Sequence, residues 1–196
     1  MFSGQIKKKD WLKLAAMKIK WPVGLIIFLL FSGTVMAQNL PSAESLLKKA
    51  YKEAVAKKKN VFIIFHASWC GPCKIMQASM KDKKIKAFFD SSYIIVDLVA
   101  FEFDEGENNP GAGELLQKHN DNNASIPFWM IQDATGKVLG DSRVVPAYNT
   151  DGTKENMGCP STEKEVDYFV SLLKKTSALT LQQLEAIRKR FRANDQ

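Results

Sequence analysis

The chain has 196 residues, a formal net charge of +7 and three cysteines. Residues 1–37 hold six lysines and one aspartate, so they carry +5 of this charge and the rest of the chain is close to neutral at +2. A neutral domain lacks the basic face that nucleic acids require, which argues against nucleic-acid binding. Three cysteines are also too few for a disulfide scaffold.

Residues 1–37 have the pattern of a secretory signal peptide. A basic start precedes the apolar run of residues 23–31, and small residues stand at alternate positions up to Ala37. We expect cleavage after Ala37, which leaves residues 38–196 as one exported, periplasmic domain. The alternative is an uncleaved membrane anchor, but the uncharged stretch is shorter than the ~20 residues of a spanning helix. Translation from Met17 would give a basic region of ordinary length.

The first part of this domain predicts helices that alternate with two buried strands. Three-and-four spacing predicts a helix over residues 42–58, with Ser42 as its N-cap. The apolar runs NVFIIFHA (60–67) and YIIVDLV (93–99) are typical of strands buried on both faces. Two helical segments are expected between the strands, one after the cysteine pair and one capped by Asp82. Their expected apolar positions are Ile75, Met76, Met80, Ile85, Phe88 and Phe89.

The second part predicts a hairpin followed by two helices. Residues 100–125 are polar, with a short helix expected around residues 112–119. The segment 126–142 holds two apolar runs around DATGK, the signature of a β-hairpin with glycine at its turn. A loop rich in Gly, Asn and Asp runs to Pro160. A helix over residues 161–175 then follows, capped by Ser161 or Thr162, and a last helix runs from about 180 to 192, with Leu181, Leu184, Ile187 and Phe191 on one side.

This order of elements predicts an α/β fold. Buried strands joined through helices indicate a parallel pair, and the hairpin adds antiparallel strands at the other edge. We therefore expect a mixed central sheet in a three-layer α/β/α sandwich, with extra helices at the N-terminal and C-terminal ends.

Cys70 and Cys73, in the sequence WCGPCK, are the candidate catalytic residues. At the first turn of a helix, such a pair has its first sulfur near unpaired N–H groups, which stabilise a thiolate, and its second on the same face. A Cys-x-x-Cys that follows a strand predicts a redox dithiol. Two alternatives stay open, a pair of inert thiols and a three-ligand metal site that includes His66.

WCGPCK, the buried strand before it and the Ile126–Pro127 step before the hairpin resemble the thioredoxin-like family. The resemblance covers about residues 42–175, and it implies a thioredoxin-like sandwich fold with a cis peptide bond before Pro127. The site residues that it implies are Cys70 as nucleophile and Cys73 as resolving cysteine, with Trp69, Gly71, Pro72, Ile126 and Pro127 binding the substrate.

The chain departs from the family pattern at Ile64. Thioredoxins usually bury an aspartate six residues before the first cysteine, where it helps to move the proton of the resolving cysteine. With Ile64 in its place, the resemblance leaves this proton to water, to His66 or to a more distant carboxylate such as Asp97.

The resemblance implies a thiol–disulfide oxidoreductase that acts on disulfides of exported proteins. The Gly71–Pro72 dipeptide matches reducing members of the family. We expect a monomer with no metal and no cofactor beyond its own dithiol, reduced by a membrane thiol electron donor. The alternatives are a non-catalytic binding or chaperone module and a dedicated assembly factor for haem or metal proteins. For Cys159, a single unreactive thiol is favoured over a regulatory or intermolecular disulfide.

Overall fold

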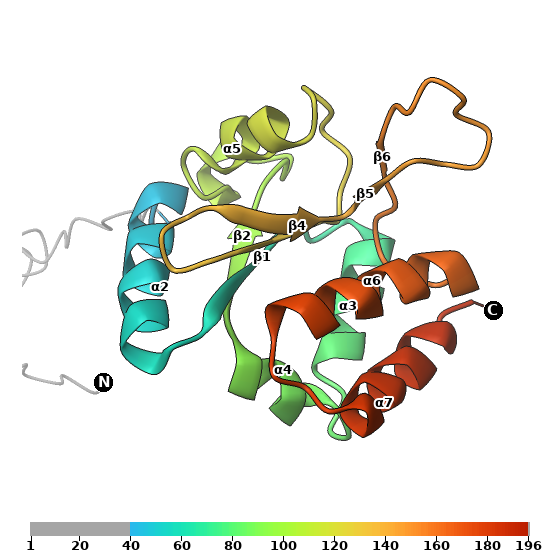
Figure 1. The fold of residues 1–196 in the computed structure, drawn as a ribbon. Coiled ribbons are helices and arrows are strands. Elements are labelled where there is room, and N and C mark those ends of the chain that lie inside the picture. The colour runs from blue at the N-terminus through green and yellow to red at the C-terminus, as the bar shows by residue number, and fades with distance from the viewer. Residues whose placement is uncertain (1–39, 196) are drawn as a thin grey trace, which may run out of the picture. The chain divides into compact units, whose positions relative to one another are not determined.

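A four-stranded mixed sheet lies at the centre of residues 40–195, the part of the chain that this computed structural model describes (Figure 1). The strand order is β2-β1-β3-β4. β1 (Asn60–His66) pairs in parallel with β2 (Tyr93–Val99) and antiparallel with β3 (Phe128–Gln132), and β3 pairs antiparallel with β4 (Val138–Asp141). The expected signal peptide lies outside the described residues.

Helices cover both faces of this sheet, so the expected α/β fold is confirmed. The helices are α2 (Ala43–Lys57), α3 (Gly71–Met80), α4 (Lys86–Ser92), α5 (Ala112–His119), α6 (Glu163–Thr176) and α7 (Leu181–Arg192), with a short 3-10 helix η1 (Glu105–Glu107) before α5. Among residues 40–195, no helix is long and apolar enough to cross a membrane.

The composition of β1 explains why both faces of the sheet are covered. All five residues from Val61 to Phe65 are buried. Phe62 and Ile64 belong to a core with α3, α4, α6 and α7, whereas Val61, Ile63 and Phe65 belong to a core with α2 and α5. Because successive side chains of a strand point to opposite faces, a continuous apolar run requires a helix layer on each side.

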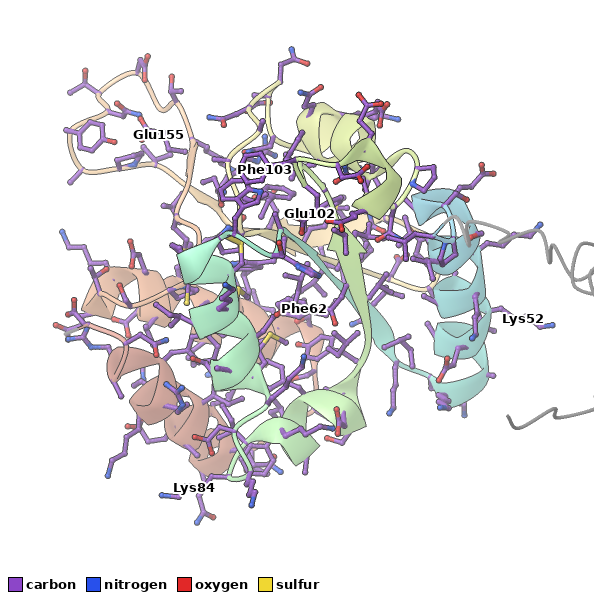
Figure 2. All side chains as sticks on the ribbon, turned by 180° about the vertical axis from the view of Figure 1, so that it is seen from behind. Lys52, Phe62, Lys84, Glu102, Phe103 and Glu155 are labelled. Carbon is purple, nitrogen blue, oxygen red and sulfur yellow. A yellow bond between two sulfur atoms is a disulfide. The ribbon has the colours of Figure 1, made fainter. Side chains whose placement is uncertain are left out.

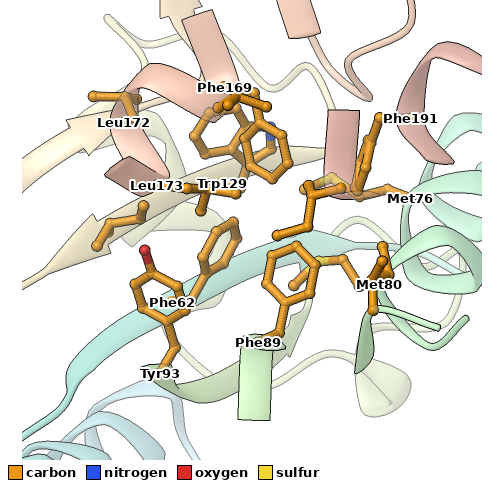
Figure 3. Close-up of a cluster of buried hydrophobic side chains, with 14 of the residues drawn as sticks. Phe62, Met76, Met80, Phe89, Tyr93, Trp129, Phe169, Leu172, Leu173 and Phe191 are labelled. Atoms are coloured by element: carbon orange, nitrogen blue, oxygen red, sulfur yellow. The ribbon is translucent and has the colours of Figure 1, made fainter. Parts of the chain in front are cut away.

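Aromatic side chains hold the C-terminal helices against the sheet (Figure 3). The ring centroid of Trp129 on β3 lies 5.8 Å from that of Phe62 and 5.1 Å from that of Phe169 on α6. Phe169 in turn lies 4.8 Å from Phe191 on α7. Contacts of this kind contribute about 0.5–1.5 kcal/mol each beyond area burial. The last helix is therefore part of the main core.

The expected helix starts are largely confirmed by hydrogen bonds at their caps. Ser42 caps α2, since its side chain accepts from the Ser45 N–H. Of the two expected caps for α6, the structure has Thr162, in a reciprocal capping box with Glu165. Thr180 caps α7 in the same way. Substitution of such a cap by alanine typically costs about 1 kcal/mol.

Four expectations from the sequence are wrong, three about single residues and one about a strand. Ile75 is 46% exposed, because it faces a surface groove instead of the core, and Leu181 is 72% exposed at the first turn of α7. Asp82 does not cap α4, which begins after Ile85; its carboxylate instead accepts from the Lys84 N–H in the preceding turn. The strand over residues 93–99 was expected to be buried on both faces, but β2 is an edge strand, and Asp97 on it is exposed.

The loop after β4 contains an unexpected two-stranded ribbon. β5 (Arg143–Val144) pairs antiparallel with β6 (Glu155–Asn156), and the residues between them extend away from the central sheet (Figure 1). No alternation of apolar and polar residues marks these strands, and two residues each are too short to give one.

Candidate active site

Cys70 and Cys73 form a disulfide at the point where the chain passes from β1 into α3, with their Cα atoms 5.3 Å apart. Cys70 is the N-cap of α3, and its sulfur accepts a hydrogen bond from the backbone N–H of Cys73 at 3.2 Å. Pro72 occupies the first turn, where a missing backbone N–H costs no helical hydrogen bond. A thiolate on Cys70 would therefore have an N–H donor and the positive helix end beside it.

Both cysteines are buried in the disulfide. Cys70 is 3% exposed and Cys73 is 1% exposed, packed with Ala67 and Ile126. Of the two, Cys70 keeps the larger open fraction. Gly71 beside it has open space where a side chain would stand.

Trp69, one of the residues that the resemblance implies for substrate binding, is an exposed ring next to Cys70, and a second aromatic ring lies beside it. Trp69 is 48% exposed, and its indole N–H donates to the Phe101 carbonyl at 2.8 Å. The ring of Phe103 is 91% exposed with its centroid 5.9 Å from that of Trp69. Glu102, which is labelled in Figure 2, accepts from the N–H and hydroxyl of Ser68 and so ties this loop to the cysteine motif.

The Ile126–Pro127 peptide also lies beside Cys70 and is cis, as the resemblance implied. The carbonyl oxygen of Ile126 is 3.7 Å from the Cys70 sulfur. Segments 56 residues apart in the sequence thus meet at the disulfide. The structure therefore brings together the cysteine motif and the Ile126–Pro127 step.

A groove of about 400 Å³ runs beside the disulfide. Its lining residues are Pro72, Ile75, Ser125, Ile126, Pro127, Asn156, Met157, Gly158, Cys159, Ser161 and Asn194. A larger hollow of about 700 Å³ lies between the β5–β6 ribbon and α6, but no residue of the cysteine motif lines it. The chemistry favours the smaller groove as the substrate site, because Pro72 and Ile126 border both the groove and the disulfide.

His66 and Asp97, the two side chains considered as acceptors of the Cys73 proton, lie on the face of the sheet that α3 covers. Ile64 is paired in register with Asp97 of β2, and both line a cavity of about 180 Å³. The side-chain amide of Gln77 on α3 donates to Asp97 at 3.4 Å. His66 is half-buried, and burial lowers its pKa, opposed by the carboxylates of Asp97 and Glu102. A neutral imidazole can accept a proton.

Cys159 has the environment of an unreactive thiol. Burial raises its pKa to about 11, and the side-chain N–H of Asn194 lies 3.8 Å from its sulfur. Thiols react as thiolates, so a raised pKa suppresses reaction.

The alternative of a metal site has no geometric basis in the described residues. Within residues 40–195, no group of three or more His, Cys, Asp and Glu side chains is placed to hold a metal ion. His66 thus does not join the two cysteines in such a group.

Comparison with known proteins agrees with this geometry. A family profile described as thioredoxin-like matches residues 42–134. A thioredoxin of Mycoplasma genitalium is 36% identical over 50 residues, which are 26% of this chain and 48% of that protein. The chain thus matches about half the length of this curated relative.

Solved structures similar to this chain include two bacterial examples. A disulphide isomerase from Xylella fastidiosa Temecula1 has a TM-score of 0.43 and 25% identity, covering 50% of this chain and 72% of that one. The C-terminal domain of DsbD from Neisseria meningitidis, in its oxidised form, has a TM-score of 0.41 and 17% identity, covering 70% of this chain and 98% of that one. The profile match, the WCGPCK motif and the sheet support the expected resemblance to the thioredoxin-like family.

Two features of the site have no signal in the sequence. The exposure of Phe103 depends on the path of an irregular acidic loop. Asn156 lies in a segment that reads only as a polar loop, yet its side chain reaches the residues on both sides of Ile126.

Proposed function

We propose that this protein is a thiol–disulfide oxidoreductase that reduces disulfides of exported proteins through Cys70 and Cys73. The observation that carries the proposal is the hydrogen bond from the Cys73 N–H to the Cys70 sulfur at the N-terminal end of α3. The same donor stabilises a thiolate at Cys70 once the pair is reduced. A lowered pKa at such a position makes the first cysteine the attacking group at neutral pH.

The reaction proceeds through a mixed disulfide. The Cys70 thiolate attacks one sulfur of the client disulfide, and the other client sulfur leaves as a thiolate. Cys73 then loses its proton and attacks the Cys70 sulfur, which releases the second client thiolate and leaves the Cys70–Cys73 disulfide. The client gains two electrons and the pair loses two, so an external thiol donor must restore the dithiol. We place that donor at the membrane, since the pattern of residues 1–37 suggests export.

The reducing direction rests on the Gly71–Pro72 dipeptide, which matches reducing members of the family. Trp69 and Phe103 on one rim and the groove on the other offer apolar surface to a protein client. Exposed aromatic side chains next to a reactive centre are typical contributors to protein binding. No cofactor is needed in this scheme.

Trapping of the mixed disulfide tests the proposal. We expect the Cys73→Ser variant, reduced and then incubated with a client that carries disulfides, such as insulin, to form a covalent adduct that dithiothreitol cleaves. The Cys70→Ser variant serves as the matched control, because it keeps a cysteine at the enclosed position and should trap nothing. Equal adduct formation by both variants would contradict the assigned roles.

A further inference from the structure

We propose that Asn156 is a positioning residue that holds the client-binding edge at Ile126, and that the ribbon segment at Asn156 and Met157 selects clients with an uncharged, apolar side chain beside the reactive cysteine. The inference rests on the proposed function and adds to it a substrate class. It arises from the β5–β6 ribbon, whose role neither the cysteine motif nor the family match assigns.

The side chain of Asn156 bridges the two residues that flank Ile126. Its Nδ2 donates to the Ser125 carbonyl at 3.1 Å, to the Ser125 hydroxyl at 3.1 Å and to the Pro127 carbonyl at 3.0 Å. Its Oδ1 accepts from the Gly158 N–H at 3.1 Å. An amide has two N–H donors and one carbonyl oxygen, so every hydrogen-bonding group of this side chain is engaged.

These contacts fix the backbone that faces Cys70. The carbonyls on both sides of Ile126 are held by one side chain, while the Ile126 carbonyl lies 3.7 Å from the Cys70 sulfur. An extended client segment can bind such an edge through main-chain hydrogen bonds, and these bonds are strongest when the edge is already ordered. Asn156 therefore acts through Ile126 without touching the reacting sulfurs.

The base of the ribbon is anchored to the core, which makes Asn156 a firm support. The Met157 N–H donates to the Ser142 carbonyl at 2.9 Å, and the indole N–H of Trp129 donates to the Gly158 carbonyl at 2.9 Å. Gly158 has a φ of +69° and lies against Pro127. The residues at the tip of the β5–β6 ribbon are largely exposed. In Figure 2 this segment is found by the label of Glu155 on β6.

The chemistry of the groove selects the occupant. Of the described residues that line it, none is charged, and Pro72, Ile75 and Met157 are apolar. A charged client side chain would lose hydration there without gaining an opposite charge among the lining residues, whereas an aliphatic one gains by burial. The groove is continuous with the disulfide through Pro72 and Ile126. It therefore fits an extended client segment with an aliphatic side chain close to its cysteine.

The positioning role is tested by comparing two asparagines of the same ribbon. Asn149 at the tip also donates to two acceptors, the Thr153 carbonyl and the Glu155 carboxylate, both at 3.0 Å. We expect Asn156→Ala to lower kcat/KM for insulin about tenfold, mainly through KM, and Asn149→Ala to change it less than about twofold. With a small aromatic disulfide, which does not need the backbone edge, the loss in Asn156→Ala should be clearly smaller than the loss with insulin.

Other results of this comparison would contradict the positioning role of Asn156. An equal loss for insulin and for the small disulfide in Asn156→Ala would show a general disturbance of Cys70, and no loss for either would show that the amide is dispensable. If Asn156→Ala does not fold, Asn156→Asp keeps the size and replaces the donor by a carboxylate, and it should show the same split between the substrates. If the unaltered protein does not reduce the small disulfide at all, the proposed function itself is contradicted.

The substrate class is tested with two disulfide peptides that differ only in leucine or lysine beside the cysteine. We expect the leucine peptide to be reduced about tenfold faster, in line with the burial of one aliphatic side chain. Met157→Glu should reverse this preference by adding a negative charge to the groove, whereas Met157→Leu should keep it. Equal rates for both peptides in the unaltered protein would overturn the selectivity.

Discussion

Ile64 on β1 lies in register with Asp97 on β2, and both line one cavity beneath α3. Ile64 is 2% exposed, whereas Asp97 is exposed and accepts a hydrogen bond from Gln77. A carboxylate is thus present one strand away from the position at which thioredoxins bury theirs, with solvent beside it. Cys73 is 1% exposed, and β1, the strand that leads into the cysteine motif, carries no carboxylate to assist its deprotonation.

We therefore predict that attack by Cys70 is fast and that release of the client is slow near neutral pH. Burial disfavours the Cys73 thiolate, so the rate of release should rise as pH increases towards the pKa of this thiol. Stopped-flow measurement of both steps between about pH 6 and pH 9 checks this. Release as fast as attack and independent of pH would show that another group already removes the proton.

The role of Asp97 in this step is testable with a neighbouring carboxylate as control. Asp90 lines the same cavity and pairs with Lys86. If Asp97 accepts the proton through water, Asp97→Asn should slow release about tenfold while Asp90→Asn leaves it within about twofold. Equal effects from both variants would point to the general charge of the cavity. No effect from either would leave His66 as the group to substitute next.

Replacement of Ile64 by aspartate should speed release at a cost in stability. The new carboxylate would stand within the apolar core formed with Phe62 and Met76, where an unpaired charge costs several kcal/mol. Ile64→Val, which should cost about 0.5–1.5 kcal/mol, controls for the loss of packing. Denaturant unfolding and the release rate are measured together. A variant that folds and shows no faster release would contradict the assigned importance of this position.

Cys159 should resist alkylation in the folded protein. Its pKa is raised to about 11, so about one thiol in a thousand is ionised near pH 8, and reactivity should rise about tenfold per pH unit up to the pKa. Iodoacetamide labelling followed by mass spectrometry measures this. In denaturant the pKa should return to about 8.5 and labelling should become rapid. Fast labelling of Cys159 in the native protein would contradict the burial of this thiol.

Two leucines of α7 should differ sharply in their contribution to stability. Leu184 is 3% exposed in the aromatic core, whereas Leu181 is 72% exposed. Leu184→Ala should lower the free energy of unfolding by about 2–5 kcal/mol. Leu181→Ala should stay within about 0.5 kcal/mol. Comparable losses from the two substitutions would contradict the packing of this helix.

The aspects of the fold that the sequence predicts are those set by local chemistry. Apolar runs identify β1 and β2, DATGK identifies the hairpin, and side-chain caps identify the starts of α2 and α6. Ile75 and Leu181 were misplaced because helical spacing shows which residues share a face without showing where the core ends. The groove that exposes Ile75 is made by segments far away in the sequence.

The candidate site also contains residues that the sequence predicts and residues that it does not. Cys70, Cys73 and Trp69 are adjacent in sequence and could be named from the motif, and Pro127 from the family resemblance. Asn156 and Phe103 could not be named, because their positions depend on how two irregular loops fold back onto the cysteine motif. Polar loops of this kind carry no periodicity that would indicate which side chain points inward.

The most direct test of the account is the reduction of insulin with dithiothreitol as electron donor. The account predicts that the unaltered protein accelerates precipitation of the insulin B chain and that Cys70→Ser, alone or together with Cys73→Ser, reduces the rate to that of dithiothreitol alone. If the double variant accelerates the reaction as well as the unaltered protein, the Cys70–Cys73 pair is not its catalytic centre.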